Sequence, residues 1–382
     1  MKRLFAISAL VGFMLTLSHT TVRAQGGGGS QNASGQRTDA ITTAVPFLTI
    51  SPDPRSGALG DAGAAIADDA NAVYWNMSNL AFTENQAGVN FTFTPWLRQI
   101  IPDIYHSFLS GYYNFGEAGG VAGLSMRYFS LGNIQFTDEQ GLETGNFNAN
   151  EFALGGHYAH LVTDNFSVGG GLRFIYSNLV GAANIGGVSQ DAATSFSGDV
   201  SMAYRNEWEI GPQRMPLGFN FGLNISNIGA KMTYNNQTTE RDFIPTNLRL
   251  GYALKFGLDD YNSITFINDI NKLMVPSEGG QSDAGLLSGM FSSYADADGG
   301  FSEEMRELMI SLGLEYWYND LFAVRAGYFW EDPNKGDRQF ITLGAGLKFK
   351  VFSLDFAYLV SPDNTHPLPN TLRFGLGLAF DS

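Results

Sequence analysis

The chain has 382 residues, of which 46 are glycine, and 13% are aromatic while only 15% are charged. A formal net charge of −15 without any basic stripe argues against a nucleic-acid partner, because phosphate binding needs clustered lysine and arginine. The absence of cysteine excludes disulfides and thiolate metal sites. This composition indicates aromatic-rich β structure with many turns.

The N-terminus predicts export. Lys2 and Arg3 precede an uncharged, apolar-biased run over residues 4–17, and Val22-Arg23-Ala24 offers a small-x-small cleavage site before Gln25. We therefore expect a secretory signal peptide over residues 1–24. The run is too short to span a bilayer, and no later run approaches the roughly twenty apolar residues that a membrane helix needs. An exported chain of this kind is periplasmic, secreted or an outer-membrane barrel, and only a barrel explains the alternation that follows.

Two segments without strand periodicity come next. Residues 25–46 begin with glycine, serine, asparagine and glutamine, including Gly26 to Gly29 in a row, and predict a flexible tether. Residues 47–83 are rich in glycine and alanine and predict a compact plug or hatch, in which residues 64–72 form a short helix. The glycines there do not make a phosphate loop, because no Lys-Ser or Lys-Thr pair follows them.

Residues 84–382 predict an all-β fold, a transmembrane antiparallel β-barrel. The last strand alternates apolar residues with small or polar ones, and the aromatic residues Phe374 and Phe380 resemble those of the closing strand of outer-membrane barrels. Ten residues of about 3.3 Å each, tilted by about 45°, rise about 23 Å, close to the apolar band of such a barrel. We count fourteen alternating runs, and an even number suits a closed barrel: residues 88–96, 106–115, 120–130, 150–161, 165–178, 194–206, 215–228, 245–257, 262–270, 307–318, 321–331, 338–349, 351–360 and 370–380.

The connections between these runs alternate in length. Short links, near residues 116–119, 163–165, 259–261 and 319–320, alternate with long links near 131–149, 179–193, 229–244 and 271–306. Outer-membrane barrels pair short periplasmic turns with longer outer loops, whereas a soluble β-sandwich has no reason to sort loop lengths by side. The pattern therefore predicts a membrane barrel with both termini in the periplasm. The long link at residues 206–215, on the short side, is an exception to it.

The order of these segments carries a family resemblance. A signal peptide, the sequence SPDPRSGALGDAG over residues 51–63, the stretch from Asn71 to Asn76 and a long barrel together resemble the PorV family, outer-membrane proteins of the type IX secretion system. That family is similar to the FadL-like fatty-acid channels. Both groups commonly have Asn-Pro-Ala just before the barrel, where this chain has Asn76-Met77-Ser78. The resemblance singles out nine plug residues: Pro52, Asp53, Arg55, Gly57, Gly60, Asp61, Asn71, Trp75 and Asn76.

The resemblance implies a function that composition and spacing do not show. A PorV-like protein is a non-catalytic component of the outer membrane of a Gram-negative cell. It binds the C-terminal signal domain of cargo at the type IX translocon barrel and carries it to the surface sortase complex. Those three, with outer-membrane lipid or lipopolysaccharide, are the expected partners. The alternative is a FadL-like channel that moves hydrophobic small molecules through the lumen.

No motif predicts catalysis, a metal or a cofactor. His157 and His160 are three apart in a predicted strand, so they face opposite sides and do not chelate one ion, and His157 is expected as a solvated lumen residue beside Glu151. No Gly-x-Ser-x-Gly or His-Glu-x-x-His motif occurs. The stretch from Asp296 to Gly300 lacks the later ligands of a calcium loop. We therefore expect no enzyme, with a lipid-deacylating Ser–His pair as the alternative, since such pairs are defined in space.

The long link at residues 271–306 is predicted to be acidic and solvated. Between Pro276 and Met305 it has no lysine or arginine. Its acidic residues are Glu278, Asp283, Asp296, Asp298, Glu303 and Glu304. The same link has apolar residues spaced to form one face of a short helix: Leu286, Leu287, Met290 and Phe291. An exposed apolar face needs a cover. Either the helix folds as a lid over its own barrel, or it docks another protein with methionine and phenylalanine as adaptable anchors.

Overall fold

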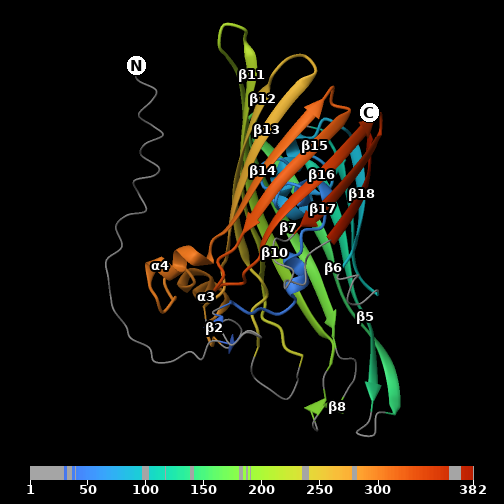
Figure 1. Cartoon of the computed structure of the whole chain (residues 1–382), viewed down its shortest axis with the longest axis vertical. Coiled ribbons are helices and arrows are strands. Elements are labelled where there is room, and N and C mark those ends of the chain that lie inside the picture. The colour runs from blue at the N-terminus through green and yellow to red at the C-terminus, as the bar shows by residue number, and fades with distance from the viewer. Residues whose placement is uncertain are drawn as a thin grey trace.

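In the computed structural model, fourteen antiparallel strands close into one barrel (Figure 1). The structure describes residues 30–31, 37–38, 40–96, 103–116, 118–137, 142–179, 184–185, 188–189, 191–234, 241–277, 282–360 and 371–381. The predicted signal peptide lies outside these residues, as does half of the predicted tether. Within them, no helix has the length and apolar character needed to cross a membrane.

Each of the fourteen predicted runs corresponds to one barrel strand, which confirms the predicted fold class. Every strand pairs with its neighbour in chain order, and the last pairs with the first, from Phe374 opposite Phe93 to Phe380 opposite Ala87. The strands are β3 (Ala87–Pro95), β4 (Ile104–Asn114), β5 (Val121–Thr137), β6 (Glu143–Thr163), β7 (Phe166–Asn178), β10 (Ala193–Ile210), β11 (Met215–Gly229), β12 (Asn247–Gly257), β13 (Asn262–Leu273), β14 (Met309–Tyr318), β15 (Phe322–Trp330), β16 (Gln339–Phe349), β17 (Phe352–Val360) and β18 (Thr371–Phe380).

Side chains alternate between the lumen and the outer surface of the barrel. In β18, Thr371 and Arg373 are buried, whereas Phe374, Leu376 and Phe380 are exposed. The same alternation recurs in β3 and in β10. The outer surface is therefore an apolar band, as a hydrocarbon environment requires.

The β5–β6 hairpin is longer than the sequence pattern predicts. Residues 131–149 were expected as a loop, but the two strands continue past a bulge after Ser130, with Asn133 opposite Asn148. Polar residues occupy much of this extension, so it lacks the apolar alternation by which strands are recognised. Backbone pairing alone is enough to continue a hairpin once its register is set.

The link at residues 206–215 is likewise a strand hairpin and not a loop. β10 continues to Ile210, which pairs with Met215 of β11. The turn between them is tight, because Gly211 and Arg214 adopt positive φ angles of 73° and 51°. The apparent exception to the alternation of loop lengths therefore disappears. Two further small hairpins lie outside the barrel sheet: β1 (Ser30–Gln31) with β2 (Arg37–Thr38), and β8 (Asn184–Ile185) with β9 (Val188–Ser189).

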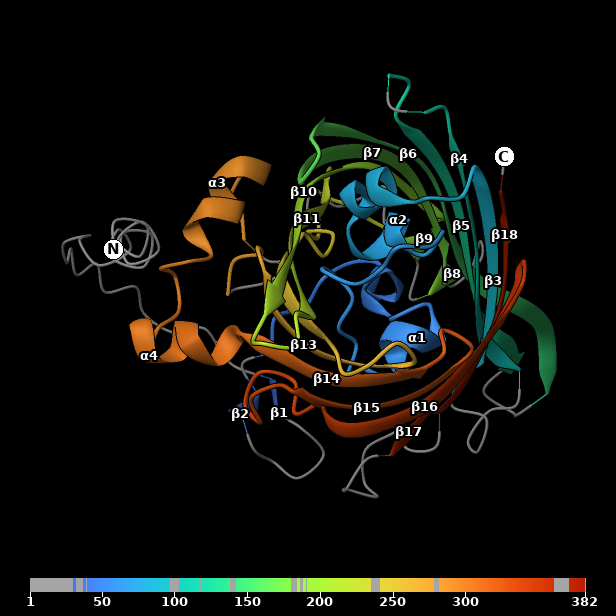
Figure 2. The ribbon, with the colours of Figure 1, turned by 90° about the horizontal axis from the view of Figure 1, so that it is seen from above.

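The segment over residues 47–83 lies inside the ring of strands (Figure 2). It contains η2 (Pro46–Thr49), α1 (Pro54–Gly57), α2 (Ala72–Trp75) and η3 (Met77–Phe82). The helix predicted over residues 64–72 is absent. Instead, the N–H groups of Gly63 and Ala64 donate to Asp269 of β13, at 2.8 and 2.9 Å, and Asp69 accepts from the Asn71 N–H at 2.8 Å. These side-chain acceptors compete with helical hydrogen bonds in this stretch.

The plug runs from one end of the barrel to the other. Near its start, Phe47 packs in a buried cluster with Met232 and Ile244 of the long link between β11 and β12. Just after its end, the Gln86 N–H donates to the carbonyl of Phe380 at 2.9 Å. The start of the plug and the C-terminal end of β18 therefore lie at opposite ends of the barrel. The predicted N-terminus of the mature chain lies outside the described residues, so the location of both termini on one side stays a prediction.

Gly60 shows how closely the plug approaches the wall. Its φ angle is 68°, and a Cβ atom at this position would lie 2.5 Å from the carbonyl oxygen of Tyr328. The Gly60 N–H donates to the hydroxyl of Thr342 at 2.9 Å. Both the backbone conformation and the contact therefore require glycine.

Replacing Gly60 with alanine is expected to lower the temperature at which the folded barrel loses its faster migration in SDS gels. The positive φ alone costs about 1 kcal/mol for an L side chain, before the contact with Tyr328 is counted. Gly156→Ala is the matched control, because a Cβ there meets no atom within 4 Å. Equal transition temperatures for the two variants would contradict the close contact between plug and wall.

Candidate functional site

Asp53 organises the first half of the plug. Its Oδ2 accepts from the Ser56 N–H at 2.9 Å, which caps α1, and its Oδ1 accepts from Trp75 Nε1 at 2.7 Å. Pro54 occupies the first turn of α1, where a missing N–H costs nothing. Trp75 is fully buried. One carboxylate thus joins α1 to α2.

Arg55 joins the plug to the barrel wall through ion pairs. Its Nε and Nη2 each donate to Glu315 of β14 at 3.1 Å, and its Nη1 donates to Asp68 at 2.6 Å. Glu315 also accepts from Arg325 Nε of β15 at 2.6 Å, and Arg325 pairs with Asp355 of β17 at 2.6 Å. Removing one partner of a buried ion pair typically costs about 3–5 kcal/mol. The alternating charges therefore fix the plug strongly to three strands.

The glycine-rich part of the plug contacts β18 and β3. Asp61 accepts from Arg373 Nη1 at 2.7 Å, and Gly57 lies so close that a Cβ there would be 2.1 Å from the same nitrogen. The carbonyl of Pro52 accepts from the hydroxyl of Thr92 at 2.7 Å. Glycine at residue 57 thus makes room for the arginine that pairs with Asp61.

The second half of the plug is held by asparagine amides. Asn71 Oδ1 accepts from the Ser110 hydroxyl at 3.1 Å, and Asn76 Nδ2 donates to the carbonyls of Ala64 and Met202 at 3.0 Å each. Asn76 Oδ1 also accepts from the Ser78 N–H at 3.1 Å and caps η3. All nine plug residues singled out by the sequence therefore lie in the lumen and hold the plug in place.

The sequence did not assign the wall residues that receive the plug. They are Asp269, Glu315, Arg325, Asp355 and Arg373, and each lies at an inward position of a barrel strand. A charge at an inward position of such a strand must be neutralised by something in the lumen. A charged residue at an inward position of a predicted strand is therefore the sequence signal that could have identified these residues.

His157 faces the lumen, as predicted, but it is buried and not solvated. Its exposed fraction is 5%, and its Nε2 lies 3.0 Å from the hydroxyl of Ser125. A Cβ on Gly155 or Gly171 would overlap its ring, so the imidazole fills the space beside two glycines. In the described part of the chain, no group of three or more acidic or histidine side chains could hold a metal ion.

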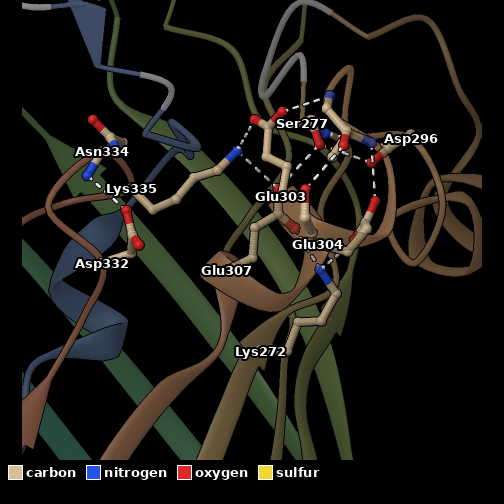
Figure 3. Close-up of polar contacts among 12 residues, drawn as sticks. Lys272, Ser277, Asp296, Glu303, Glu304, Glu307, Asp332, Asn334 and Lys335 are labelled. Atoms are coloured by element: carbon tan, nitrogen blue, oxygen red, sulfur yellow. Dashed lines mark hydrogen bonds and ion pairs between the residues drawn. The ribbon is translucent and has the colours of Figure 1, made fainter.

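The link between β13 and β14 is held to the barrel by buried lysines (Figure 3). Lys272 Nζ pairs with Glu304 at 3.1 Å and with Glu307, and Lys335 Nζ pairs with Glu303 at 2.6 Å and with Glu307 at 3.1 Å. We call these five residues the lysine clamp. Glu304 is 7% exposed, so the prediction of a solvated acidic loop is wrong there. The two lysines come from β13 and from the β15–β16 connection, outside the stretch that has no lysine or arginine. Glu278 of the same link lies outside the described residues.

The lysine clamp changes the protonation of its members. The hydrogen bond from Lys335, followed by that from the Gly299 N–H, holds the pKa of Glu303 below its ordinary value. Burial alone would lower the pKa of Lys335, but its hydrogen bond to Glu303 and the charge of Glu307 raise the pKa overall. Burial raises the pKa of Asp296, which accepts from the Ser277 hydroxyl at 2.8 Å. Both Glu303 and Lys335 are therefore held in their charged forms.

The clamped link contains the predicted helix. It forms α3 (Leu286–Ser292), α4 (Phe301–Glu304) and η5 (Met305–Glu307). Met290 is buried, and Gly289 packs so closely that a Cβ there would lie 2.7 Å from the Phe243 ring. Leu287 and Phe291, in contrast, are 62% and 70% exposed. The four apolar residues therefore divide between an inner contact and the surface.

Exposed apolar side chains gather on this link. We call them the outer apolar surface: Leu287, Phe291, Tyr294, Phe301 and Met305. Figures 1 and 2 both show α3 and α4 beside the barrel and not across its opening. The helix therefore does not form a lid over the barrel in this structure, which was one of the two alternatives that the sequence allowed. The lysine clamp explains the position, because it fastens the link to the end of β13 and to the β15–β16 connection.

These features define an outer-membrane type of β-barrel. A closed antiparallel barrel, an apolar outer face, a plugged lumen and long connections at one end belong together in that class. A family described as "Type IX secretion system protein PorV" matches residues 32–279, which span the plug and barrel strands β3 to β13. The chain belongs to this family and is thus an outer-membrane component of type IX secretion.

Comparisons with individual proteins are more distant. No curated protein matches the sequence. Similar solved structures include the toluene transporter TbuX of Ralstonia pickettii, with 13% identity, coverage of 87% of this chain and 100% of that chain, and a TM-score of 0.49. The toluene transporter TodX of P. putida has 12% identity, coverage of 86% and 98%, and a TM-score of 0.48. A FadL homologue of Pseudomonas aeruginosa has 14% identity, coverage of 90% and 100%, and a TM-score of 0.41.

Replacing Lys335 with methionine is expected to loosen the outer link. The change leaves two clamp glutamates without this partner, so the link detaches more often and chymotrypsin cleaves at Phe291 and Phe301 several-fold faster in the folded, detergent-solubilised protein. Gel electrophoresis and mass spectrometry of the fragments measure the rate. Lys348→Met, which removes an exposed lysine near the end of β16, is the matched control. An unchanged cleavage rate in Lys335→Met would show that the clamp does not hold the link.

Proposed function

We propose that the protein binds the C-terminal signal domain of cargo at the type IX translocon barrel and carries it to the surface sortase complex, without catalysing a reaction. Membership of the PorV family supports the general role in secretion. The observation that carries the docking step is the outer apolar surface, held in place by the lysine clamp. A surface that is fixed before binding avoids the cost of ordering a loop when the partner arrives.

The position of the outer apolar surface supports the translocon barrel as its partner. α3 and α4 lie beside the barrel wall, where a second barrel in the same membrane would meet them. Cargo would instead approach from the barrel opening. Exposed aromatic side chains such as Phe291 and Phe301 are suitable anchors for a protein interface. Outer-membrane lipid or lipopolysaccharide would cover the remaining wall.

Replacing Leu287 and Phe291 together with serine is expected to abolish recovery of the translocon barrel. The measurement is a gentle-detergent pull-down of the tagged protein from outer membranes, with mass spectrometry of the co-purifying chains. The wild type is expected to recover a large barrel and secreted proteins that retain their C-terminal domains. Asp298→Ser, an exposed change on the same link, is the control and is expected to recover both.

The folded state of the double variant separates docking from stability. Its heat-dependent shift in SDS gels is expected to remain intact, because both side chains are mostly exposed. Loss of that shift together with the partner would mean that the two residues stabilise their own barrel. Recovery of the translocon barrel by the double variant would contradict the proposed docking surface.

A FadL-like channel for hydrophobic small molecules is the second candidate. A cavity in the lumen favours it. The ion pairs that fasten the plug to Glu315 and Arg373 oppose it, because a continuous path would require them to break. Recovery of the wild-type barrel alone, with extractable fatty acid, would favour the channel.

We also propose an orientation in which the long connections and the start of the plug lie at the cell surface, while β18 ends in the periplasm. The chain lacks cysteine, so single cysteines report position cleanly. Thr42→Cys, at an exposed residue, is expected to react with a membrane-impermeant maleimide on intact cells. Asp381→Cys, also exposed, is expected to react only after the outer membrane is permeabilised. The reverse result would contradict this orientation.

A further inference from the structure

A cavity of about 280 Å³ lies in the lumen between the plug and the wall. Tyr74 and Trp75 of the plug line one part of it, and Asn227, Asn247 and Asn271 line the facing strands β11 to β13. The cavity therefore combines aromatic surface with amides. Some lining residues, such as Asp61 and Lys335, also take part in the plug contacts and the lysine clamp described above.

Among the described residues, two of the three cations that line this cavity hydrogen-bond to carboxylates, and the third does not. Lys335 belongs to the lysine clamp, and Arg338 donates to Glu331 at 2.7 Å. The third cation is Arg249 of β12, which has no hydrogen bond to a carboxylate among the described residues. Asp269 is near enough to interact with it electrostatically, but the Oδ2 of Asp269 accepts the plug N–H groups described above.

Arg249 is held rigidly. Its exposed fraction is 8%, and its Nε donates to Asn271 Oδ1 at 2.7 Å. Its guanidinium carbon lies 4.5 Å from the ring centre of Trp75 and 5.3 Å from that of Tyr74. Neither of its Nη atoms has a hydrogen-bond partner in the part of the chain that the structure describes. Two strong donors are therefore oriented in advance and unused.

We propose that this cavity binds a carboxylate carried on a small apolar or aromatic body, with Arg249 as the anion-binding residue. Guanidinium presents paired N–H donors in the geometry that a carboxylate accepts. Tyr74, which lines the cavity, offers surface to the apolar body. The cavity volume, about 280 Å³, is just below the size range of ligand pockets, roughly 300–1,000 Å³, so the body is small.

Two sources supply this chemistry: the carboxyl end of a peptide chain, and a free small carboxylic acid. The inference goes beyond the proposed docking function and does not depend on it. Binding at Arg249 requires only the folded barrel, whereas docking requires the outer apolar surface. A negative result for carboxylate binding therefore does not contradict the docking proposal, and a negative result for docking does not contradict carboxylate binding.

The test measures binding of two acid and amide pairs to the detergent-purified, full-length protein by calorimetry. The first pair is phenylacetate with phenylacetamide, and the second is N-acetyl-alanyl-phenylalanine with its C-terminal amide. At least one acid is expected to bind about tenfold more tightly than its amide, because hydrogen bonds to a charged acceptor are the stronger ones. Preference for the peptide acid alone identifies a chain end, and binding of phenylacetate identifies a free small acid; both results support the carboxylate site.

Variants assign the site to Arg249. Arg249→Gln is expected to weaken acid binding by about tenfold and to leave amide binding unchanged, since it removes the charged donor. Arg205→Gln is the matched control, because Arg205 is a lumen arginine that stacks on Phe82 at 4.8 Å and does not line the cavity. Equal affinity of the wild type for acids and amides would overturn the proposal, as would undiminished acid binding by folded Arg249→Gln. Should that variant not fold, the acid and amide comparison on the wild type still decides.

Discussion

The ion pairs between plug and wall are the interaction on which the rest of the structure depends. Glu315 lies between Arg55 of the plug and Arg325 of the neighbouring strand, and all three side chains are shielded from solvent. A charge buried without a partner is costly, so each of these groups requires the others. The wall of the barrel is therefore incomplete without the plug. A plug fixed in this way behaves as part of the barrel and not as a separate hatch.

The same requirement operates at the rim of the barrel. Lys272 of β13, Lys335 of the β15–β16 connection and three glutamates of the β13–β14 link neutralise one another only when these parts of the chain meet. A link that looks acidic in the sequence is thus paired with lysines from other parts of the chain. In the same link, Met290 is buried and Phe291 is exposed.

The sequence predicts those parts of the fold that the membrane dictates. Lipid demands an apolar residue at every second position, and this is why the strand around Phe374 and its thirteen counterparts were recognisable. Beyond the membrane that demand ends, so the extension of β5 and β6 past Ser130 left no apolar pattern. The family resemblance identified Arg55 and Asp61 as important, but not why.

The remaining features depend on contacts between distant parts of the chain. Glu315 follows Arg55 by 260 residues, and Asp269 follows Gly63 by 206 residues, so no local pattern relates them. The helix expected over residues 64–72 failed for the same reason, because a distant carboxylate takes N–H groups of that stretch. The link that contains α3 and α4 is likewise paired with Lys335, which lies in another connection. The alternation within a strand predicts that such a residue faces the lumen, but it does not predict which residue it contacts there.

The path of the plug also constrains how the protein assembles. The ring closes when β18 pairs with β3, and by then the plug occupies the lumen from end to end. Trp75 is fully enclosed, and Arg55 and Asp61 are bound to the wall, so a segment entering a finished ring would have to desolvate its charges before it reached their partners. We therefore expect the plug to be in place before closure. The part of the chain that is synthesised first serves as the template around which the last strand closes.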